Sequence, residues 1–420
     1  MLNTTKYHEH LYHCSGTYEC NSLNFWLKLP MQRSKNAFIE WNESMSNTQN
    51  TLLSGLKVLD FSTLLPGPFA TLMLADMGAD VIHIESPSRM DLVRIMPPYA
   101  DGQATAHGYL NRNKRSVALD LKVPENINKI KELVKEYDII VEQFRPNVMA
   151  RLGLDYETLS KINPRLIYCS ITGYGQTGSH KDRAGHDINY ISLSGIAGHS
   201  GRVNGLPPAM GIQIADVAGG SLHGVIGILA AVIERHTSGL GQHIDISMTD
   251  CVFTMNTMAG AAQIAGGEMQ APEQGMLNGG TFYDYYQTQD GRFLSIGSLE
   301  PQFLMGLAQA LALPDLARLG SSLQPEDRAT VRSMIREAIA AHPLEYWNQL
   351  FAALDVCVEP VLSLAEAVDS ELANQRGWVV DVPLEVGSDK TQKQIAHPIK
   401  YSRSQPVYRF MGRAVGADEV

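Results

Sequence analysis

The chain has 420 residues, of which 44% are apolar and 19% charged, and its formal net charge at pH 7 is −10. This length is sufficient for two domains, and the composition excludes a globally disordered or collagen-like chain. The acidic balance argues against a nucleic-acid partner, although it still allows a local basic pocket for phosphates. Five scattered cysteines indicate no disulfide framework and favour a reducing, cytoplasmic location. We expect no membrane span, because no apolar run approaches the roughly 20 residues that a bilayer requires.

Residues 1–50 show neither a helical nor a strand period. They contain a small group of metal-binding residue types, namely His8, His10, His13, Cys14 and Cys20. The spacing of this group matches no known ligand pattern, so we predict no metal site. We predict that 1–50 is a poorly structured extension that contributes little packing, and that folded sequence begins at about residue 51.

Short apolar runs alternate with helical patterns from residue 51 to about 250. The runs expected to form strands are 56–61, 80–85, 116–121, 138–143, 166–172 and 242–247. Helices are expected over 69–77, 125–137 and 216–235. This alternation predicts βαβ units around a parallel sheet. The fold class is therefore α/β, with a large Rossmann-like domain over 51–250 that is completed by about 385–420.

A second pattern begins after the glycine-rich loop that precedes residue 281. Two strand-like runs, 282–288 and 293–297, flank the turn Gln289-Asp290-Gly291-Arg292, which is typical of a hairpin. Helical segments follow at 301–311, 325–341 and 344–354. We predict a smaller α+β domain over 275–380.

The loop after the first strand disfavours one class of cofactor. Leu64–Phe69 reads LLPGPF where a dinucleotide-binding protein has Gly-x-Gly-x-x-Gly. Proline has no backbone N–H, so Pro66 and Pro68 remove donors that would cradle a pyrophosphate. We therefore predict no nicotinamide enzyme and no tightly bound cofactor.

A basic segment, 111–115 (NRNKR), is followed by 119–122 (LDLK). A run of charges is most often a solvated loop. Alternatively, it forms a phosphate-binding rim, because guanidinium and ammonium groups both bind phosphate oxygens. Arg145 and Arg151 add two cations near the end of a predicted strand, where ligands gather in open α/β sheets.

Three further segments contain groups that can transfer protons. His186 and Asp187 lie in AGHDINY, which follows a glycine-rich stretch that would allow close backbone approach to a ligand. A buried hydrogen-bonded His–Asp pair is the alternative. Asp216 begins a predicted helix and could be an ordinary N-cap, and Glu300 could be a solvent-facing loop acid. Spacing alone does not bring these segments together.

From about Leu53 to its end, the chain resembles the family III CoA-transferases, and within them the α-methylacyl-CoA racemases. The matching segments occur in one order, as SGLKVLDFSTLLPGPFATLMLADMGADVIHIE, NRNKRSVALDLK, EQFRPNVMARLGL, NPRLIYCSITGYGQTG, AGHDINYISLSG, IADVAGG, SGLGQHID and IGSLEPQF. The resemblance implies an acyl-CoA thioester substrate, with coenzyme A as part of that substrate. It also implies an interlocked homodimer, in which the small domain of one chain closes the active site of the other.

The resemblance further implies a two-base site. His186 matches the family's catalytic histidine, Asp216 the opposing acid, and Glu300 the carboxylate that pairs with the histidine. The residues expected to contact CoA are Arg112, Arg115, Leu119, Asp120, Leu121, Lys122, Arg145, Arg151, Gly185, Ile188, Asn189 and Tyr190. The chain departs from the racemases at Ser86, where they commonly have arginine, and over 90–108, a longer segment that looks more like the transferases.

The activity expected from this resemblance is α-methylacyl-CoA racemisation through a thioester enolate. A thioester α-proton is weakly acidic, so its removal requires a positioned base on each face and stabilisation of the enolate oxygen. In this hypothesis Glu300 orients His186, as an acid does beside a catalytic histidine. Backbone N–H groups near Gly219–Gly220 would help to hold the enolate.

Two alternatives stay open at this stage. The first is a CoA-transferase that moves CoA between carboxylic acids, with Asp187 attacking the thioester to form an acyl anhydride. The second is a non-catalytic acyl-CoA-binding module, which would not require acids that converge on the α-carbon.

Overall fold

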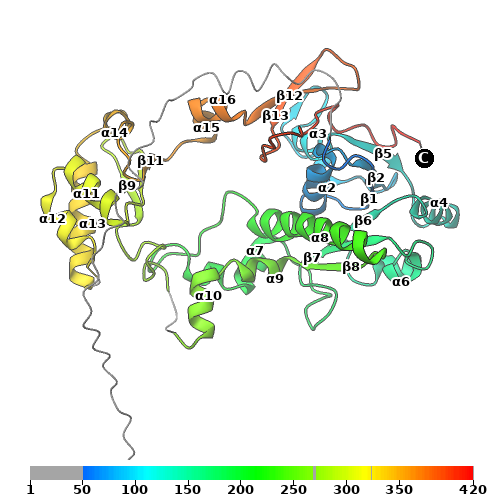
Figure 1. Ribbon diagram of the computed structural model, residues 1–420, viewed down its shortest axis with the longest axis horizontal. Helices are drawn as coiled ribbons and strands as arrows, with labels where there is room; N and C mark the ends of the chain where they lie inside the picture. The colour runs from blue at the N-terminus through cyan, green and yellow to red at the C-terminus, as the bar shows by residue number, and fades with distance from the viewer. Residues whose placement is uncertain (1–50, 268–270, 323, 420) are drawn as a thin grey trace, which may run out of the picture. The chain divides into compact units, whose positions relative to one another are not determined.

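The structure, a computed structural model, describes residues 51–419 except 268–270 and 323 (Figure 1). The predicted extension, 1–50, lies outside the described residues. Six parallel strands form the main sheet: β1 (Lys57–Asp60), β2 (Asp80–Glu85), β5 (Lys114–Ala118), β6 (Ile139–Glu142), β7 (Ile167–Thr172) and β8 (His243–Ser247). Their order is β5-β2-β1-β6-β7-β8, and every neighbouring pair is parallel. This doubly wound order confirms the predicted Rossmann-like sheet.

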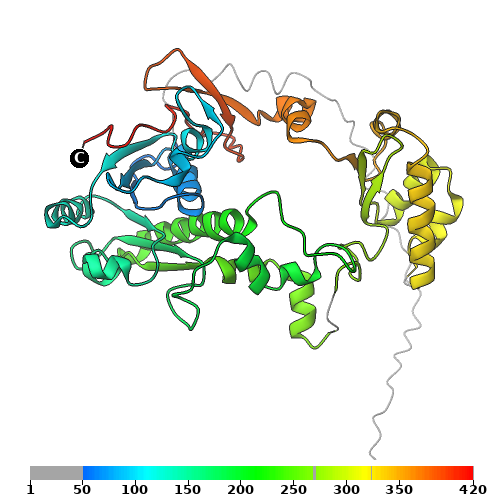
Figure 2. The ribbon, with the colours of Figure 1, turned by 180° about the vertical axis from the view of Figure 1, so that it is seen from behind.

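The central strands β1, β6 and β7 are buried on both faces, which explains why they are mainly apolar runs. Leu59 and Ile140 point to a core shared with α4 (Pro124–Val134), α5 (Val148–Leu152) and α6 (Tyr156–Leu159). Their neighbours Val58 and Ile139 point to the opposite core, shared with α2 (Pro66–Asp76), α8 (His223–Ser238) and α9 (Met248–Thr254). Figures 1 and 2 both show α8 lying along β7 and β8, the strands that it contacts.

Two predicted element boundaries were wrong for identifiable reasons. Helix α2 starts at Pro66, three residues before the predicted start, because proline is tolerated in the first turn of a helix. Strand β5 starts at Lys114 rather than Ser116. Lys114 fits the buried strand because its Nζ lies 3.2 Å from Oδ2 of Asp60 on β1.

The helix predicted over 216–235 has two parts. A π-helical segment, η3 (Ala215–Leu222), leads directly into α8. The N-cap position is Ile214, without a side-chain cap, so Asp216 is not the N-cap that was considered as an alternative to a catalytic role. π-helical turns are rare and often occur at functional sites.

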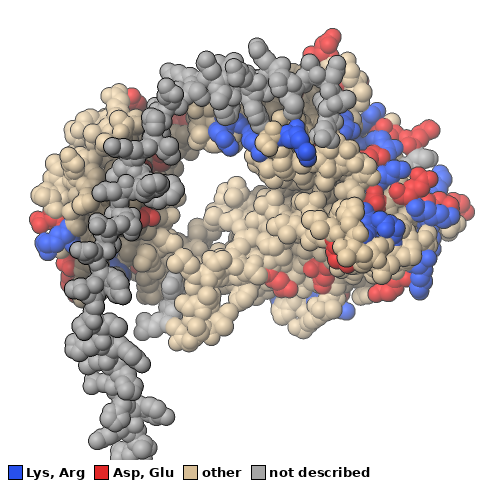
Figure 3. Space-filling view, in the orientation of Figure 1, with Lys and Arg blue, Asp and Glu red and all other residues tan. Residues whose placement is uncertain are grey.

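Ala215–Ser238 is the one described helix whose length and mean hydropathy, 1.7, would permit a membrane span. Val225, Ile228 and Ala231 pack in the sheet core, which identifies it as a core helix. Three apolar side chains on its other side are exposed, namely Leu222 (38%), Ile226 (63%) and Ile233 (70%). Figure 3 shows that the face over α8, α9 and α10 (Thr257–Ile264) is mostly uncharged, whereas charged side chains gather toward α4 and α6.

A second, antiparallel sheet has the order β11-β10-β9. The predicted hairpin is present as β9 (Asp284–Gln287) and β10 (Phe293–Ile296), and β11 (Val358–Pro360) was not predicted. Four helices share its core: α11 (Pro301–Ala310), α12 (Pro314–Leu319), α13 (Pro325–Ile339) and α14 (Leu344–Phe351). Tyr286, Leu304 and Trp347 are central to this core. The antiparallel sheet with its helices confirms the α+β character predicted for this part.

After α15 (Leu364–Asp369) and α16 (Glu371–Arg376), the chain forms the hairpin β12 (Val379–Pro383) and β13 (Thr391–Ile395). The segment that follows returns to the main sheet. Its backbone hydrogen bonds join Val407 N to Asp76 O, Asn113 N to Phe410 O, and Asp418 N to Ser116 O. The last residues of the chain therefore pack against α2 and β5.

Candidate active site

The strand order places a topological switch point between β1 and β6, because the chain leaves these neighbouring strands in opposite directions. Open α/β sheets bind ligands in a crevice at such a point. The first turn of α2, which follows the loop after β1, meets the turn after β6, where the Gly67 N–H donates to Gln143 Oε1 at 3.0 Å. Leu64 in the same loop has a φ of 60°, in the left-handed region. The Asp91 carboxylate holds it there by accepting the Leu64 N–H at 3.1 and 3.2 Å. A strained residue at a topological switch point is typical of a ligand site.

Helix α7 (Asp187–Leu193) begins at the predicted GHDINY motif. His186 immediately precedes the helix, and its backbone N–H donates to Asn189 Oδ1 at 3.0 Å. The side chain of His186 is exposed. Tyr190 is buried, and its hydroxyl donates to Gly185 O at 2.6 Å. A Cβ on Gly185 would lie 2.7 Å from the hydroxyl of Tyr174 and from the ring of Tyr190, so this close approach requires glycine.

Asp187 ties α7 to the π-helical segment η3. Its Oδ1 accepts the backbone N–H of Ala215 at 2.6 Å and that of Asp216 at 3.0 Å. Burial raises the pKa of Asp216 to about 6, the negative charge of Asp187 adds to the rise, and His186 opposes it. His186, Asp187 and Asp216 are therefore within electrostatic reach of one another. An acid with a pKa near 6 is well suited to accept a proton at neutral pH.

Gly219 and Gly220 allow η3 to pack closely. A Cβ on Gly219 would meet Met248 O at 3.1 Å, and one on Gly220 would meet the Pro66 side chain at 3.0 Å. Both glycines are buried. Their packing against α9 and against the loop after β1 positions Asp216 beside the crevice, and an enolate contact here stays a prediction.

Glu300 belongs to a different part of the fold. It is the residue before α11, which packs in the core of the antiparallel sheet, and its side chain is exposed. Among the described residues, no hydrogen bond or ion pair joins Glu300 to His186. The structure of one chain therefore brings together three of the four predicted catalytic residues.

The phosphate contact predicted for Arg112 conflicts with its position. Arg112 is only 1% exposed, and its Nη2 lies 2.5 Å from Oδ2 of Asp76 on α2. Its Nε donates to Asp76 Oδ1 at 2.9 Å, and its Nη1 donates to Ile395 O at 2.6 Å. The guanidinium is an internal ion-pair partner, and all three of its nitrogens are occupied.

Arg115 is also committed within the protein. It lies near the amino end of β5, away from the carboxyl edge where the crevice opens. Its Nη2 lies 2.8 Å from Asp80 Oδ2 and donates to the Tyr137 hydroxyl at 3.1 Å. The sequence pattern suggested that 111–115 is either a solvated loop or a phosphate-binding rim. Arg115 instead binds Asp80 and Tyr137 within the protein.

The other predicted CoA contacts lie on turns and helices near the carboxyl ends of the strands. After β5, Leu119 is buried, Leu121 is half-buried and Lys122 is exposed, and Asp120 Oδ1 accepts the Lys122 N–H at 3.0 Å. Arg145, Arg151, Ile188 and Asn189 are all exposed. Burial raises the pKa of Tyr190 to about 12, Asp216 adds to the rise, and Arg145 opposes it. Arg145 therefore lies close enough to act on α7 electrostatically.

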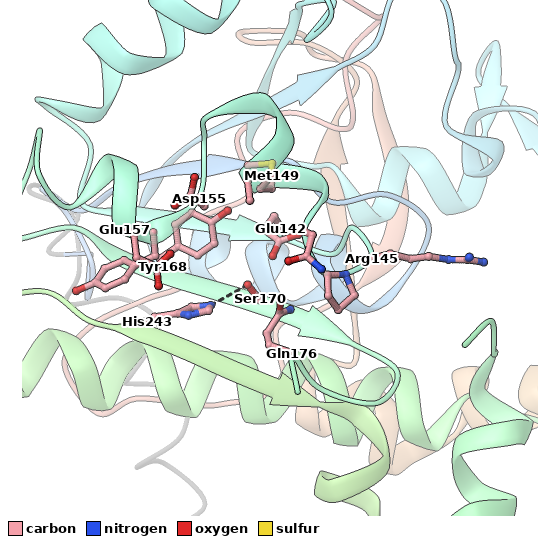
Figure 4. Close-up of a pocket in the computed structure, with 13 residues that line it drawn as sticks. Glu142, Arg145, Met149, Asp155, Glu157, Tyr168, Ser170, Gln176 and His243 are labelled. Atoms are coloured by element: carbon pink, nitrogen blue, oxygen red, sulfur yellow. Dashed lines mark hydrogen bonds between the residues drawn. The ribbon is translucent and has the colours of Figure 1, made fainter. Parts of the chain in front are cut away.

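One cluster was missed by the sequence analysis. Glu142, Ser170 and His243 line a cavity of about 250 Å³ beside the turn that carries Arg145 (Figure 4). The available signal was a charged or polar residue inside an apolar strand run, as in DIIVEQ and IYCSIT. Such residues are expensive to bury without partners.

A doubly wound sheet whose ligand edge has a histidine, two neighbouring carboxylates and an exposed arginine defines an α/β enzyme equipped for acid–base chemistry. The sequence profile of "CoA-transferase family III" matches residues 53–419. The chain therefore belongs to CoA-transferase family III, whose members act on acyl-CoA.

Three similar proteins illustrate the range of the family. The α-methylacyl-CoA racemase of Homo sapiens is 37% identical over 328 residues, 77% of this chain and 81% of that protein. The succinate–glutarate CoA-transferase of Agrobacterium fabrum is 33% identical over 373 residues, 84% of this chain and 92% of that protein. The crystal structure of a CAIB/BAIF family protein from Brucella suis superposes with a TM-score of 0.76 at 28% identity, covering 88% of this chain and 97% of that one.

Proposed function

We propose that the protein is an α-methylacyl-CoA racemase. The observation that carries the proposal is that Asp187 joins the start of α7, next to His186, to η3, which places Asp216, whose pKa is raised to about 6, within electrostatic reach of His186. In the reaction, one group removes the α-proton as its carboxylate or neutral imidazole. The electron pair moves into the thioester as an enolate, and the conjugate acid of the other group returns a proton to the opposite face. The reaction changes neither the composition nor the oxidation state of the substrate.

Asp187 has a supporting role in this proposal. Two backbone N–H groups donate to its Oδ1, which stabilises the carboxylate and holds it beside Asp216. A CoA-transferase is the second candidate, because Asp187 occupies the position of the transferase nucleophile and a family transferase is 33% identical. In that reaction Asp187 would attack the thioester carbonyl, release CoA thiolate and carry the acyl group as an anhydride.

Isotope exchange separates the two reactions. Incubation with one enantiomer of a 2-methylacyl-CoA in deuterated water should place deuterium at the α-carbon and produce the other enantiomer. In a transferase, hydroxylamine would instead cleave the acyl anhydride and leave Asp187 as its hydroxamate, and turnover would require a carboxylic acid as acceptor. Trapping of that adduct without deuterium at the α-carbon would overturn the racemase proposal.

We also propose a homodimer in which the partner subunit supplies Glu300 to the site. Exposed Ile226 and Ile233 on α8 support the dimer, because solvent contact of such side chains is unfavourable and an interface would bury them. The position of Glu300 apart from His186 supports its supply in trans.

The double variant Ile226→Glu/Ile233→Glu should be monomeric by light scattering and inactive. Glu234→Lys, an exposed change on the same helix, should stay dimeric.

Complementation tests the source of Glu300. His186→Ala and Glu300→Gln should each be deficient in racemisation. Mixed dimers of the two would have one intact site if Glu300 acts in trans, and none if it acts within its own chain. Activity should therefore reappear after the two variants are unfolded and refolded together. Failure of mixed dimers to regain activity would contradict exchange of Glu300 between subunits.

Arg145→Ala should weaken CoA binding by about 1–3 kcal/mol, the range for loss of a charge-assisted hydrogen bond. The expectation rests on its exposed position after β6 and its electrostatic reach to α7. Titration calorimetry with CoA measures the change. Arg165→Ala is the control, because Arg165 is an exposed arginine that precedes β7 at the opposite end of the strands. Equal affinities of Arg145→Ala and wild type would remove Arg145 from the site.

A further inference from the structure

The turn that carries Arg145 is held from behind by a buried acid. Glu142 is the last residue of β6 and is 4% exposed. Its Oε2 accepts the backbone N–H of Phe144 at 2.8 Å, so the carboxyl group fastens the turn on which Gln143 and Arg145 lie. Gln143 in turn holds the first turn of α2 through Gly67. The turn after β6 is therefore tied to Glu142 on one side and to the start of α2 on the other.

A polar row extends from Glu142 across the face of the sheet. Ser170 on β7 is the register partner of Glu142, and its Oγ lies 3.0 Å from Nε2 of His243 on β8. The Tyr156 ring stacks on His243 at 5.7 Å, and the Tyr168 ring meets it edge-on at 5.4 Å. Figure 4 shows Glu142, Ser170 and His243 in sequence along the cavity, with the Arg145 side chain extending away from it. The row connects the cavity to the CoA-binding turn.

The groups around Glu142 favour its neutral form. Burial raises its pKa to about 7 and Asp245 on β8 adds to the rise, whereas hydrogen bonds from Ser170 and Phe144 oppose it. Asp155 and Glu157 at α6 also line the cavity, and Tyr156 and Tyr168 supply phenol groups. Burial lowers the pKa of His243, so its imidazole is mainly neutral at pH 7. Arg145 is the one arginine or lysine among the lining residues, and it points outward.

We propose that Glu142, assisted by Ser170 and His243, is a positioning residue for the CoA-binding turn, and that its ionisation strengthens the binding of coenzyme A. The proposal rests on the proposed function, in which Arg145 contacts CoA. An ionised carboxylate accepts the Phe144 N–H in a charge-assisted bond, which is stronger than the bond to a neutral acid. The proton leaves through Ser170 and His243 to the cavity, and Ser170 then donates its hydroxyl hydrogen to Glu142.

Calorimetric titration with coenzyme A across about pH 6 to pH 8 tests this mechanism, since ionisation of Glu142 falls in that window. Wild type should bind CoA about fivefold more tightly at the upper end, the change expected when a neutral hydrogen bond becomes charge-assisted. In Glu142→Gln, which keeps an acceptor for Phe144 but cannot ionise, this gain in affinity, the pH step, should be lost, and only the pH dependence from groups common to both proteins, such as Asp216, should remain. In Ser170→Ala the midpoint of the step should move to higher pH, because a hydrogen bond that stabilises the carboxylate is lost.

Two control variants test whether the pH effect on CoA binding arises at Glu142 and acts through Arg145. Glu157→Gln removes an exposed acid at the same cavity and should leave the step unchanged. Arg145→Ala should lose the step together with the affinity, because the effect acts through that side chain. A full step in Glu142→Gln, or an unmoved midpoint in Ser170→Ala, would overturn the inference. Absence of CoA binding at every pH would instead contradict the proposed function.

Discussion

Replacement of His186 by alanine should slow α-proton exchange from one enantiomer of a 2-methylacyl-CoA by about 10²–10⁴-fold, the usual contribution of a general base. Exchange from the other enantiomer should be affected far less, because Asp216 remains to remove the proton on the opposite face. Asp216→Asn should show the reverse preference. Deuterium incorporation, followed by mass spectrometry for each pure enantiomer separately, measures both rates.

The pH dependence of the same exchange identifies the base on each face. Burial and the charge of Asp187 raise the pKa of Asp216 to about 6, so exchange initiated by its carboxylate should fall as the pH drops through that value. Asp187→Asn removes a negative charge, so the exchange rate should begin to fall only at a lower pH. The asparagine oxygen can still accept the N–H groups of Ala215 and Asp216, so the variant should weaken substrate binding more than it slows chemistry. Equal losses for both enantiomers in His186→Ala would contradict a two-base mechanism.

The strands were predictable because parallel strands buried on both faces appear as uninterrupted apolar runs. The boundaries at Asp80–Glu85 were predicted without error, and those of β6 and β7 within one residue. The π-helical start of η3 was not predictable, because the residues of η3 and α8 are equally apolar and their periods differ only slightly. Local pattern does not distinguish the two geometries, although the difference positions Asp216.

The site was predicted by resemblance rather than by spacing. His186 and Asp216 become neighbours because a carboxylate oxygen on Asp187 accepts two backbone N–H groups of η3, a contact between residues 28 and 29 positions apart. Nothing in the local pattern of either segment indicates that bond. Glu142 was missed for a similar reason. Its burial depends on β7 and β8, which follow it in the chain.

Arg112 shows where a local pattern misleads. Its segment looks solvated because all five of its residues are polar. Its partner Asp76 lies 36 residues earlier, and Ile395, whose carbonyl it binds, lies 283 residues later. The rings of Tyr109 and Tyr408 lie 5.1 and 4.9 Å from the guanidinium carbon. Arg112 thus joins α2 to β13 and to the segment after it, and its charge can be buried only when these distant parts of the chain have come together.

Arg112→Met should therefore destabilise the protein by about 3–5 kcal/mol, because it leaves the buried carboxylate of Asp76 without its main counter-charge. Asp76 also accepts from Asn113 Nδ2 at 2.8 Å, and that single neutral donor does not compensate for the lost guanidinium. The double variant Asp76→Asn/Arg112→Met removes both charges and should recover part of the loss. Urea unfolding, monitored by circular dichroism, measures the free energies.

Lys122→Ala is the matched comparison for Arg112→Met. Lys122 is an exposed cation that follows β5, whereas Arg112 is a buried cation that precedes it. It should change stability by no more than about 0.5 kcal/mol, as surface substitutions usually do. The effects of the two variants on CoA affinity should be the reverse of their effects on stability. Folded Arg112→Met, measured well below its unfolding midpoint, should bind CoA with wild-type affinity, whereas Lys122→Ala should bind more weakly. If Arg112→Met were as stable as wild type but bound CoA poorly, the guanidinium would have to reach the ligand, and its assignment to the internal ion pair with Asp76 would be wrong.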